Sequence, residues 1–498
     1  MTHDNPDIPL LIDGQDVQHP STFDVVSPGT ADVCWKAVSA TTEDATKVVE
    51  AAQTAFSSWS QTKPSTRAAI LLKAANILEA NVERYADYMM TEMGADRGTA
   101  QFFVTPLAIA MCRDIAGRIS SVCGSVPVVA KESQSAMVWK EPYGVILSVV
   151  AWNAPYVFGI RSAATAIATG NTTVIKSSEL TPRCYYELGK AFKEAGLPDG
   201  VFNVVACRKE DAQIIVNTMI EHPAVRKVNF TGSAATGRKI ARTCGENLKP
   251  ILMELGGKNT AIILADADLG KAAQECLAGA FLNLLQAKVG KGIASYAGIN
   301  IVQAGQICMG TDRVAIHVSV ASEFTEVLKQ QLENLAKSSP SPPTVSSNTS
   351  KDRLTQLVTS AIGAGAQLIA GHPNPSSLPG TSFIPTILSN VPSTTPLYHE
   401  EAFGPLLSLC TFTTDNEAIT FTNSTPYGLH AAVFSKDLRR AFGIAKKLDV
   451  GAVHVNSMTV HDEPALPMGG VKGSGWGRFN AAEGMEEFLC RKVVTWDD

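Results

Sequence analysis

The feature that most constrains this chain is the alternation of short apolar runs with longer stretches of helical pattern. The run GVILSVV at residues 144–150 is almost entirely apolar and rich in β-branched residues, which is typical of a strand buried on both faces of a parallel sheet. Similar runs, separated by helical stretches such as YYELGKAFKEAGLP and AQIIVNTMIEH, are TTVIKSS, GVFNVVA, KVNFTG, PILMELGG and NTAIILADAD. This order of elements predicts a doubly wound α/β domain.

Two flanking regions extend the pattern. Between Thr42 and Met93 apolar residues recur at three- and four-residue intervals, which predicts two amphipathic helices. Beyond the first domain, the helical LGKAAQECLAGAFLN, the strand-like DRVAIHVS and a long helix ending near Lys337 predict a second α/β domain. The Ser/Pro-rich SSPSPPTVSSN that follows is expected to be a surface loop.

Composition excludes several classes of protein. At about 150 residues per domain, the 498 residues provide for roughly two to four domains. A net charge of -5 does not favour nucleic acid or an anionic membrane as a partner. The ten cysteines form no CxxC motif, which argues against a structural metal site or a disulfide framework and predicts a reducing, cytoplasmic location.

No targeting or membrane segment is predicted. The amino-terminal MTHDNPDIPLLIDGQ does not have the pattern of a signal peptide. Residues 142–160 are uncharged, but Pro142, Gly144, Asn153, Pro155 and Gly159 interrupt them, so they are not expected to span a bilayer.

Dense local motifs stand where predicted strands run into loops, although no strict GxGxxG or Walker loop occurs. They are AWNAPY (151–156), IKSSE (175–179), FTGS (230–233), MELGGK (253–258), GQIC (305–308), EEAFGP (400–405) and PMGGVKGSGWGR (467–478). In order and chemistry they resemble the aldehyde dehydrogenase superfamily, from near Leu10 to the last strand. The resemblance implies a Rossmann-like cofactor domain, an α/β catalytic domain and a small β element for oligomerisation.

A catalytic set follows from this resemblance. Cys308 is the candidate nucleophile, since a thiol is the side chain most readily activated near neutral pH and GQIC matches the family's nucleophile loop. Asn153 and the backbone N–H of Cys308 are implied as donors to an oxyanion. Glu254 matches the base that activates water against a thioester, which favours hydrolysis to the free acid.

The resemblance also implies a dinucleotide site. Gly232 and Ser233 begin a predicted helix, where unpaired N–H groups stabilise a pyrophosphate. Lys176 and Glu179 resemble the pair that binds the adenine ribose, and a carboxylate there favours NAD, with NADP possible. The remaining cofactor residues implied are Trp152, Glu401 for the nicotinamide ribose and Phe403 beside the nicotinamide ring.

Positions that line the substrate tunnel in the family correspond here to Ala154, Phe158, Arg161, Met309, His461 and Met468. They indicate a flat, partly polar aldehyde. Arg161 either meets a phenolate or carboxylate of the substrate or forms a salt bridge, and the residues alone leave both open. Overall the pattern is most similar to the salicylaldehyde and vanillin branch, which includes fungal relatives of aromatic polyketide pathways.

The predicted organisation assigns 1–120 and 142–255 to the NAD-binding domain, 256–483 to the catalytic domain, and 121–141 with 484–498 to an oligomerisation element that pairs strands between subunits of a homodimer or homotetramer. Residues 284–303 lengthen the family's spacing between Glu254 and Cys308. They are either an insertion that loops out or a translated stretch that is absent from the working protein, and the sequence leaves both open. Two alternatives remain: a cysteine-dependent acyl hydrolase, and an inactive structural homologue disabled by the insertion.

Overall fold

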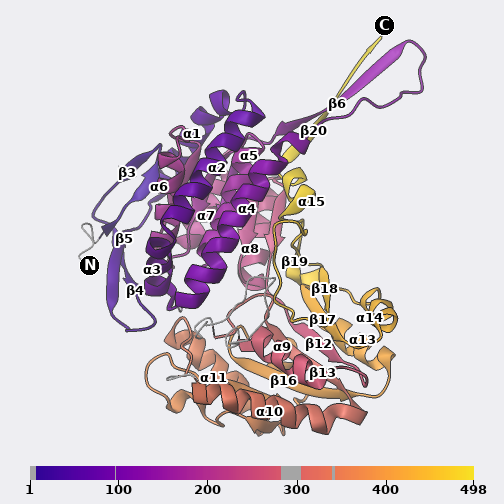
Figure 1. Ribbon diagram of the computed structural model, residues 1–498. Coiled ribbons are helices and arrows are strands. Elements are labelled where there is room, and N and C mark those ends of the chain that lie inside the picture. The colour runs from indigo at the N-terminus through magenta and orange to yellow at the C-terminus, as the bar shows by residue number, and fades with distance from the viewer. Residues whose placement is uncertain (1–6, 96, 282–303, 339–341, 498) are drawn as a thin grey trace.

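The computed structural model describes residues 7–95, 97–281, 304–338 and 342–497. The predicted insertion at 284–303 lies outside these residues. Figure 1 shows two α/β units, one above the other, and a long two-stranded ribbon that projects from the upper unit. Among the described residues, no helix has both the length and the apolar character needed to cross a membrane.

The upper unit is built on an eight-stranded sheet whose central strands are parallel. Its strands, in spatial order, are β19 (Gly475–Trp476), β11 (Ile251–Glu254), β10 (Val225–Thr231), β7 (Val145–Val149), β8 (Thr172–Lys176), β9 (Phe202–Val205), β2 (Leu10–Ile12) and β3 (Gln15–Val17). The predicted apolar runs therefore form the sheet. β7 and β8 are buried along their full length, as expected for strands covered on both faces.

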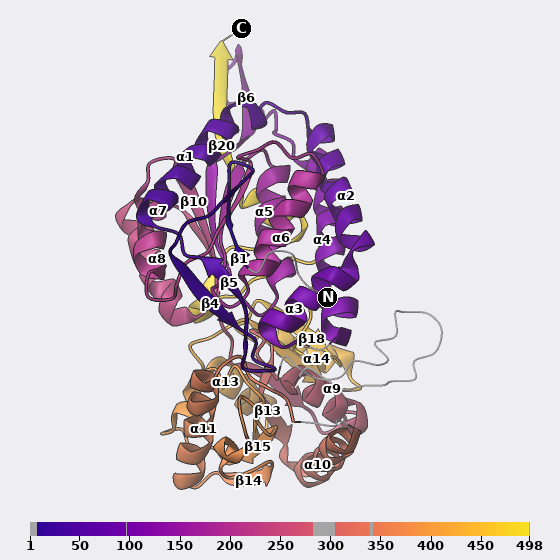
Figure 2. The same ribbon diagram turned by 90° about the vertical axis from the view of Figure 1, so that its left-hand side faces the viewer.

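Helices cover both faces of this sheet (Figure 2). One face carries α1 (Thr42–Trp59), α7 (Ala212–Glu221) and α8 (Ala234–Glu246). The other carries α2 (Pro64–Ala80), α3 (Val82–Met93), α4 (Thr105–Arg118), α5 (Pro155–Ala168) and α6 (Pro182–Glu194). The second of the two helices predicted before Met93 is in fact two, α2 and α3, which meet at Asn81.

The lower unit contains a seven-stranded sheet. Its strands, in spatial order, are β14 (Gln367–Ala370), β15 (Thr386–Ser389), β16 (Leu406–Phe412), β13 (Thr311–His317), β12 (Asn259–Ile263), β17 (His430–Phe434) and β18 (Ala452–Val455). The helices of this unit are α9 (Leu269–Phe281), α10 (Ala321–Ser338), α11 (Asn348–Gly363), α12 (Pro396–His399), α13 (Asp415–Asn423) and α14 (Leu438–Ala445).

The segment predicted to be a surface loop after α10 is partly interior. Val345 is fully buried in the apolar cluster around Leu354, and its N–H donates to the Thr381 carbonyl at 3.0 Å. The Ser/Pro composition indicated a loop, but burial of this valine depends on packing against α11 that the local sequence does not reveal.

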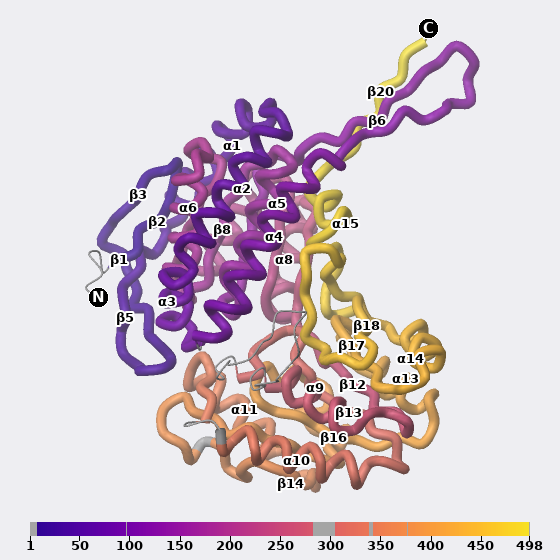
Figure 3. Tube along the Cα trace, viewed as in Figure 1, coloured from indigo at the N-terminus to yellow at the C-terminus, as the bar shows by residue number. Residues whose placement is uncertain are grey.

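Segments near the two ends of the chain form two further, smaller sheets. A small sheet combines β1 (Asp7–Ile8), β5 (Val33–Val38) and β4 (Thr22–Val26), and the ribbon pairs β6 (Gln134–Pro142) with β20 (Leu489–Asp497). In the tube of Figure 3 the yellow C-terminal segment runs from the lower unit back along the upper one before it enters the ribbon. Consequently β19 lies in the first sheet and α15 (Ala481–Glu486) packs against α4, although both begin within the stretch 256–483 assigned to the catalytic domain.

Candidate active site

The predicted motifs meet where the two large sheets face each other. In the upper sheet Val149 pairs with Lys176, and Thr231 pairs with Glu254, so the loops after β7, β8, β10 and β11 leave from one edge. In the lower sheet Asn259 pairs with Thr311 at the start of β12 and β13. Because ligands of open α/β sheets bind at the carboxyl ends of the strands, this junction is the candidate active site.

Cys308 lies in the loop that leads into β13. Gly305 takes a φ of +70°, and a Cβ there would lie 2.3 Å from the Ala280 carbonyl, so the tight turn requires glycine. The Asn259 amide donates to the carbonyls of Cys308 (2.8 Å) and Gly310 (2.9 Å), which fixes the end of the loop that follows Gly305. Cys308 is partly exposed, which a nucleophile that must meet a substrate requires.

The surroundings of the Cys308 thiol disfavour the thiolate form. Burial, together with the neighbouring carboxylates of Glu254 and Glu401, raises its pKa to about 12, and the Arg161 guanidinium acts in the opposite direction. A positive charge beside the thiol is therefore needed to favour the thiolate.

Asn153 reaches the same loop. It is buried, and its Nδ2 donates to the Gln306 carbonyl at 3.0 Å, two residues before Cys308. The predicted amide donor and the predicted nucleophile are therefore brought together.

Glu254 ends β11 with its side chain in the interior. The residue is 3% exposed, and its Oε1 has no hydrogen-bond partner among the described residues. Burial raises the pKa of this carboxyl to about 7; Arg161 and Arg478 oppose the shift, and Asp462 adds to it. A carboxyl that titrates near neutrality can accept a proton from water at working pH.

The residues predicted for the adenine half of a dinucleotide lie along the same edge. Lys176 ends β8 and is buried, and its Nζ lies 4.0 Å from Oε2 of Glu179. Ser233 caps α8, accepting from the Thr236 N–H at 3.3 Å, while a Cβ on Gly232 would lie 2.6 Å from the Phe230 ring. A helix N-terminus beside a Lys/carboxylate pair fits a pyrophosphate and a ribose.

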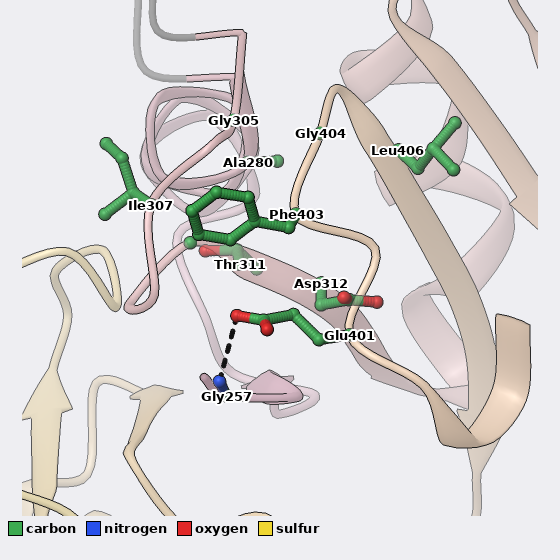
Figure 4. Close-up of a pocket in the computed structure, with 11 residues that line it drawn as sticks. Gly257, Ala280, Gly305, Ile307, Thr311, Asp312, Glu401, Phe403, Gly404 and Leu406 are labelled. Carbon is green, nitrogen blue, oxygen red and sulfur yellow. Dashed lines mark hydrogen bonds between the residues drawn. The ribbon is translucent and has the colours of Figure 1, made fainter. Parts of the chain in front are cut away.

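The residues predicted for the nicotinamide half lie nearer Cys308. Figure 4 shows Glu401 pointing toward Gly257, whose N–H it accepts at 3.1 Å, with the Phe403 ring above. Burial raises the pKa of Glu401 to about 8. The Phe403 and Trp152 rings meet edge to face, with centroids 6.2 Å apart, so these cofactor candidates form one wall.

Several residues that support the site were missed. Lys258 and Asp312 form a buried ion pair at 2.5 Å, and the second oxygen of Asp312 accepts the Ala402 N–H at 2.8 Å, which holds the loop between Glu401 and Phe403. Lys258 and Asn259 come directly after the two glycines of MELGGK, at the start of an apolar strand. Charged and amide residues at that position are the signal that could have revealed them. Nothing local marks Asp312.

Of the predicted substrate residues, Met309 and Met468 pack in one apolar cluster with Cys308. Ala154 directly precedes α5, and Phe158 lies in the first turn of that helix. His461 is partly exposed and lies 3.5 Å from the Glu463 carboxylate. Met309 and Met468, which lie far apart in sequence, therefore meet at Cys308.

Arg161 takes the second of its two predicted roles. Its guanidinium forms a buried ion pair with Asp462, whose Oδ1 accepts from Asn480 at 2.8 Å. The side chains of Arg161 and Asp462 are 3% and 5% exposed, so the partner is internal rather than at the surface. In this structure the guanidinium is therefore not an open receptor for a substrate anion.

The glycine-rich PMGGVKGSGWGR shapes backbone, as expected. Ser474 donates through its hydroxyl to the Gly256 carbonyl at 2.7 Å and accepts the Gly428 N–H at 2.9 Å. The segment thereby joins the loop after Glu254 to the lower unit.

Comparison with known proteins gives the family. The model of the aldehyde dehydrogenase family matches residues 15–287 and 284–494, two segments that meet where the spacing departs from that of the family. The chain belongs to the aldehyde dehydrogenase family. The predicted fold and enzyme class are confirmed.

Similar proteins include a vanillin dehydrogenase of a Pseudomonas species, 37% identical over 98% of this chain and 97% of the relative. A salicylaldehyde dehydrogenase of another Pseudomonas strain is 33% identical over 97% and 96%. Among solved structures, a salicylaldehyde dehydrogenase from Pseudomonas putida G7 complexed with salicylaldehyde has a TM-score of 0.91 at 30% identity, with 99% of each chain covered. A betaine aldehyde dehydrogenase from Staphylococcus aureus in complex with NAD+ has a TM-score of 0.89 at 28% identity, covering 98% and 95%.

Proposed function

We propose that this chain oxidises an aromatic aldehyde to its carboxylic acid with NAD, through a thioester on Cys308. The observation that carries the proposal is the meeting at one sheet junction of a partly exposed thiol, the Asn153 amide and the buried carboxylate of Glu254, whose Oε1 has no hydrogen-bond partner among the described residues. A thiol nucleophile, an amide donor and a base are what covalent oxidation followed by hydrolysis needs.

The Cys308 sulfur adds to the carbonyl carbon of the aldehyde, and the thiol proton leaves to water. Charge develops on the former carbonyl oxygen, where the Asn153 amide, freed from the Gln306 carbonyl, donates a hydrogen bond worth about two to three decades in rate. Lys176, Glu179, Gly232, Ser233 and Glu401 would hold NAD, with Trp152 and Phe403 beside its reactive ring. When bound, NAD would supply the acceptor for the hydrogen and electron pair that the former aldehyde carbon must lose for a thioester to remain on Cys308.

Glu254 acts in the second half of the reaction. It takes one proton from a water molecule whose oxygen attacks the thioester carbon. The carbon–sulfur bond breaks, the electron pair returns to Cys308, and the carboxylic acid is released. The pKa of about 7 suits this role, because the carboxylate form is then populated at neutral pH and still basic enough to accept the proton.

An aromatic substrate is supported by the apolar cluster of Met309 and Met468 around Cys308 and by the substrates named for the vanillin and salicylaldehyde relatives. The test is a panel of aromatic and aliphatic aldehydes with NAD and with NADP, followed by the absorbance of reduced nicotinamide. Ester cleavage without any aldehyde-dependent reduction would instead favour an acyl hydrolase.

Assembly and location are part of the proposal. The β6–β20 ribbon carries exposed apolar side chains, Trp139, Val493 and Trp496 among them, far from the body of the chain, which fits pairing with a second copy. Light scattering should give a dimer or tetramer. All ten cysteines are free, which fits a reducing compartment such as the cytoplasm.

A further inference from the structure

Two buried side chains of opposite charge near Cys308, Glu254 and Arg161, each have one polar atom without a hydrogen-bond partner among the described residues. These atoms are Oε1 of Glu254 and Nε of Arg161. Buried charges are costly unless they are paired, so a guanidinium beside a free carboxylate is expected to bind it. Here the guanidinium binds another carboxylate.

That carboxylate is Asp462. Its Oδ2 contacts Nη2 of Arg161, and its Oδ1 is held by the Asn480 amide at 2.8 Å. The guanidinium also lies over the rings of Phe158 and Phe479, 5.7 and 5.4 Å from their centroids. The ion pair and the two rings together hold the Arg161 head group in place.

The ion pair stands in the wall of the site. Phe479 exchanges two backbone hydrogen bonds with Met468, at 2.8 and 2.9 Å, and Met468 packs in the cluster that contains Cys308. Arg161 lies in α5, the helix that begins two residues after Asn153. Arg161 also lowers the pKa of both Glu254 and Cys308, so its charge acts on both reacting groups.

We propose that Asp462 is a positioning residue: by binding Arg161 it keeps the Glu254 carboxylate without a guanidinium partner and therefore available as the base. This inference rests on the proposed function. Besides Arg161 and Asp462, the charged group that acts on Glu254 is Arg478, whose Nη1 is occupied by the carbonyls of Gly470 (2.9 Å) and Gly477 (2.7 Å). Arg161 is thus the cation that Asp462 must restrain.

Asp462→Asn tests the role with no change in size. Released from its partner, Arg161 is expected to bind Glu254, and a bound guanidinium weakens the carboxylate as a base. The first turnover, measured as a burst of reduced nicotinamide, should persist, while steady-state turnover falls at least tenfold, a part of the about 10²–10⁴-fold that a general base supplies. The acid limb of the pH profile should move to lower pH.

Two variants make the test specific. Glu463→Gln removes the neighbouring carboxylate, which is half-exposed and lies outside the ion pair, and should leave burst and turnover unchanged. The double variant Arg161→Gln/Asp462→Asn removes the cation as well and should recover most of the hydrolysis rate. If Asp462→Asn does not fold, Asn480→Ala, which loosens Asp462 without removing charge, should give a smaller loss in the same direction.

A readout without aldehyde or NAD separates this inference from the proposed function. The rate of alkylation of Cys308 by iodoacetamide, followed against pH, should shift to lower pH in Asp462→Asn, because a negative charge near the thiol has gone, and not in Glu463→Gln. Equal slowing of first and later turnovers, a double variant as slow as the single one, or an unmoved alkylation profile would each overturn the role of Asp462. Failure of the unaltered chain to reduce NAD would instead reject the proposed function.

Discussion

Gly475 pairs with Glu254 across the antiparallel edge between β19 and β11. The glycine takes a φ of +110°, and a Cβ there would lie 2.1 Å from the Met253 carbonyl. A residue near the C-terminus therefore fixes the end of the strand that carries the proposed base.

Gly475→Ala should lower both stability and turnover. A side chain at this φ costs about 1–3 kcal/mol, and relief of the clash must move β11 and with it Glu254. Thermal unfolding and steady-state kinetics measure the two effects. Gly245→Ala is the matched control, because Gly245 lies within α8 with open space around its Cβ position, and there alanine should be neutral or stabilising. An active, equally stable Gly475→Ala would show that this pairing does not position the base.

Cys308→Ala should abolish aldehyde oxidation, because it removes the thiol that forms the proposed thioester. Cys123→Ala, at an exposed cysteine far from the site, should keep full activity. Reduced nicotinamide absorbance with an aromatic aldehyde measures both. If Cys308→Ala oxidised the aldehyde at the rate of the unaltered chain, the reaction would not pass through a thioester on Cys308.

Glu254→Gln should give a single burst of reduced cofactor and then stall. The amide keeps the size of the side chain but cannot accept the proton of water, so the acyl group stays on Cys308. Rapid mixing measures the burst, and intact-protein mass spectrometry should detect the acyl-enzyme. Steady turnover by this variant would mean that another group hydrolyses the thioester.

Stability should fall below pH 6.5 because two histidines, the buried His430 and the partly buried His454, resist protonation. Burial lowers the pKa of His430 to about 4, and burial with the neighbouring His430 and His461 lowers that of His454 to about 3. The unfolded chain binds these protons near the ordinary value of 6.5, so the stabilisation is complete above that pH and is lost as the pH falls toward 4. Each histidine contributes up to about 1.4 kcal/mol per pH unit in this window.

Urea unfolding at a series of pH values measures this slope. His454→Gln should make it shallower, whereas His399→Gln, at an exposed histidine, should leave it unchanged. An unchanged slope in His454→Gln would mean that other groups set the acid limit.

Local sequence predicted those parts of the site that are carried by strand ends. The runs before Trp152, Lys176, Gly232 and Glu254 had to become parallel strands, and parallel strands bring their carboxyl ends to one edge. The partner of Arg161 could not be predicted in the same way, because Asp462 lies 301 residues further along the chain and no periodicity links the two. The break at Asn81 between α2 and α3 is local: the residue leaves the helical conformation, and its side-chain amide donates to the Ile77 carbonyl at 2.8 Å.

The ribbon has a consequence for biosynthesis. β6 is synthesised early, but its partner β20 is formed by the last residues of the described chain, and β19 reaches the first sheet only shortly before them. A ribosome-bound or truncated product must therefore leave β6 as a bare edge and Glu254 unsupported. Synthesis of β19 and β20 is the step that both finishes the candidate active site and creates the ribbon through which copies would recognise one another.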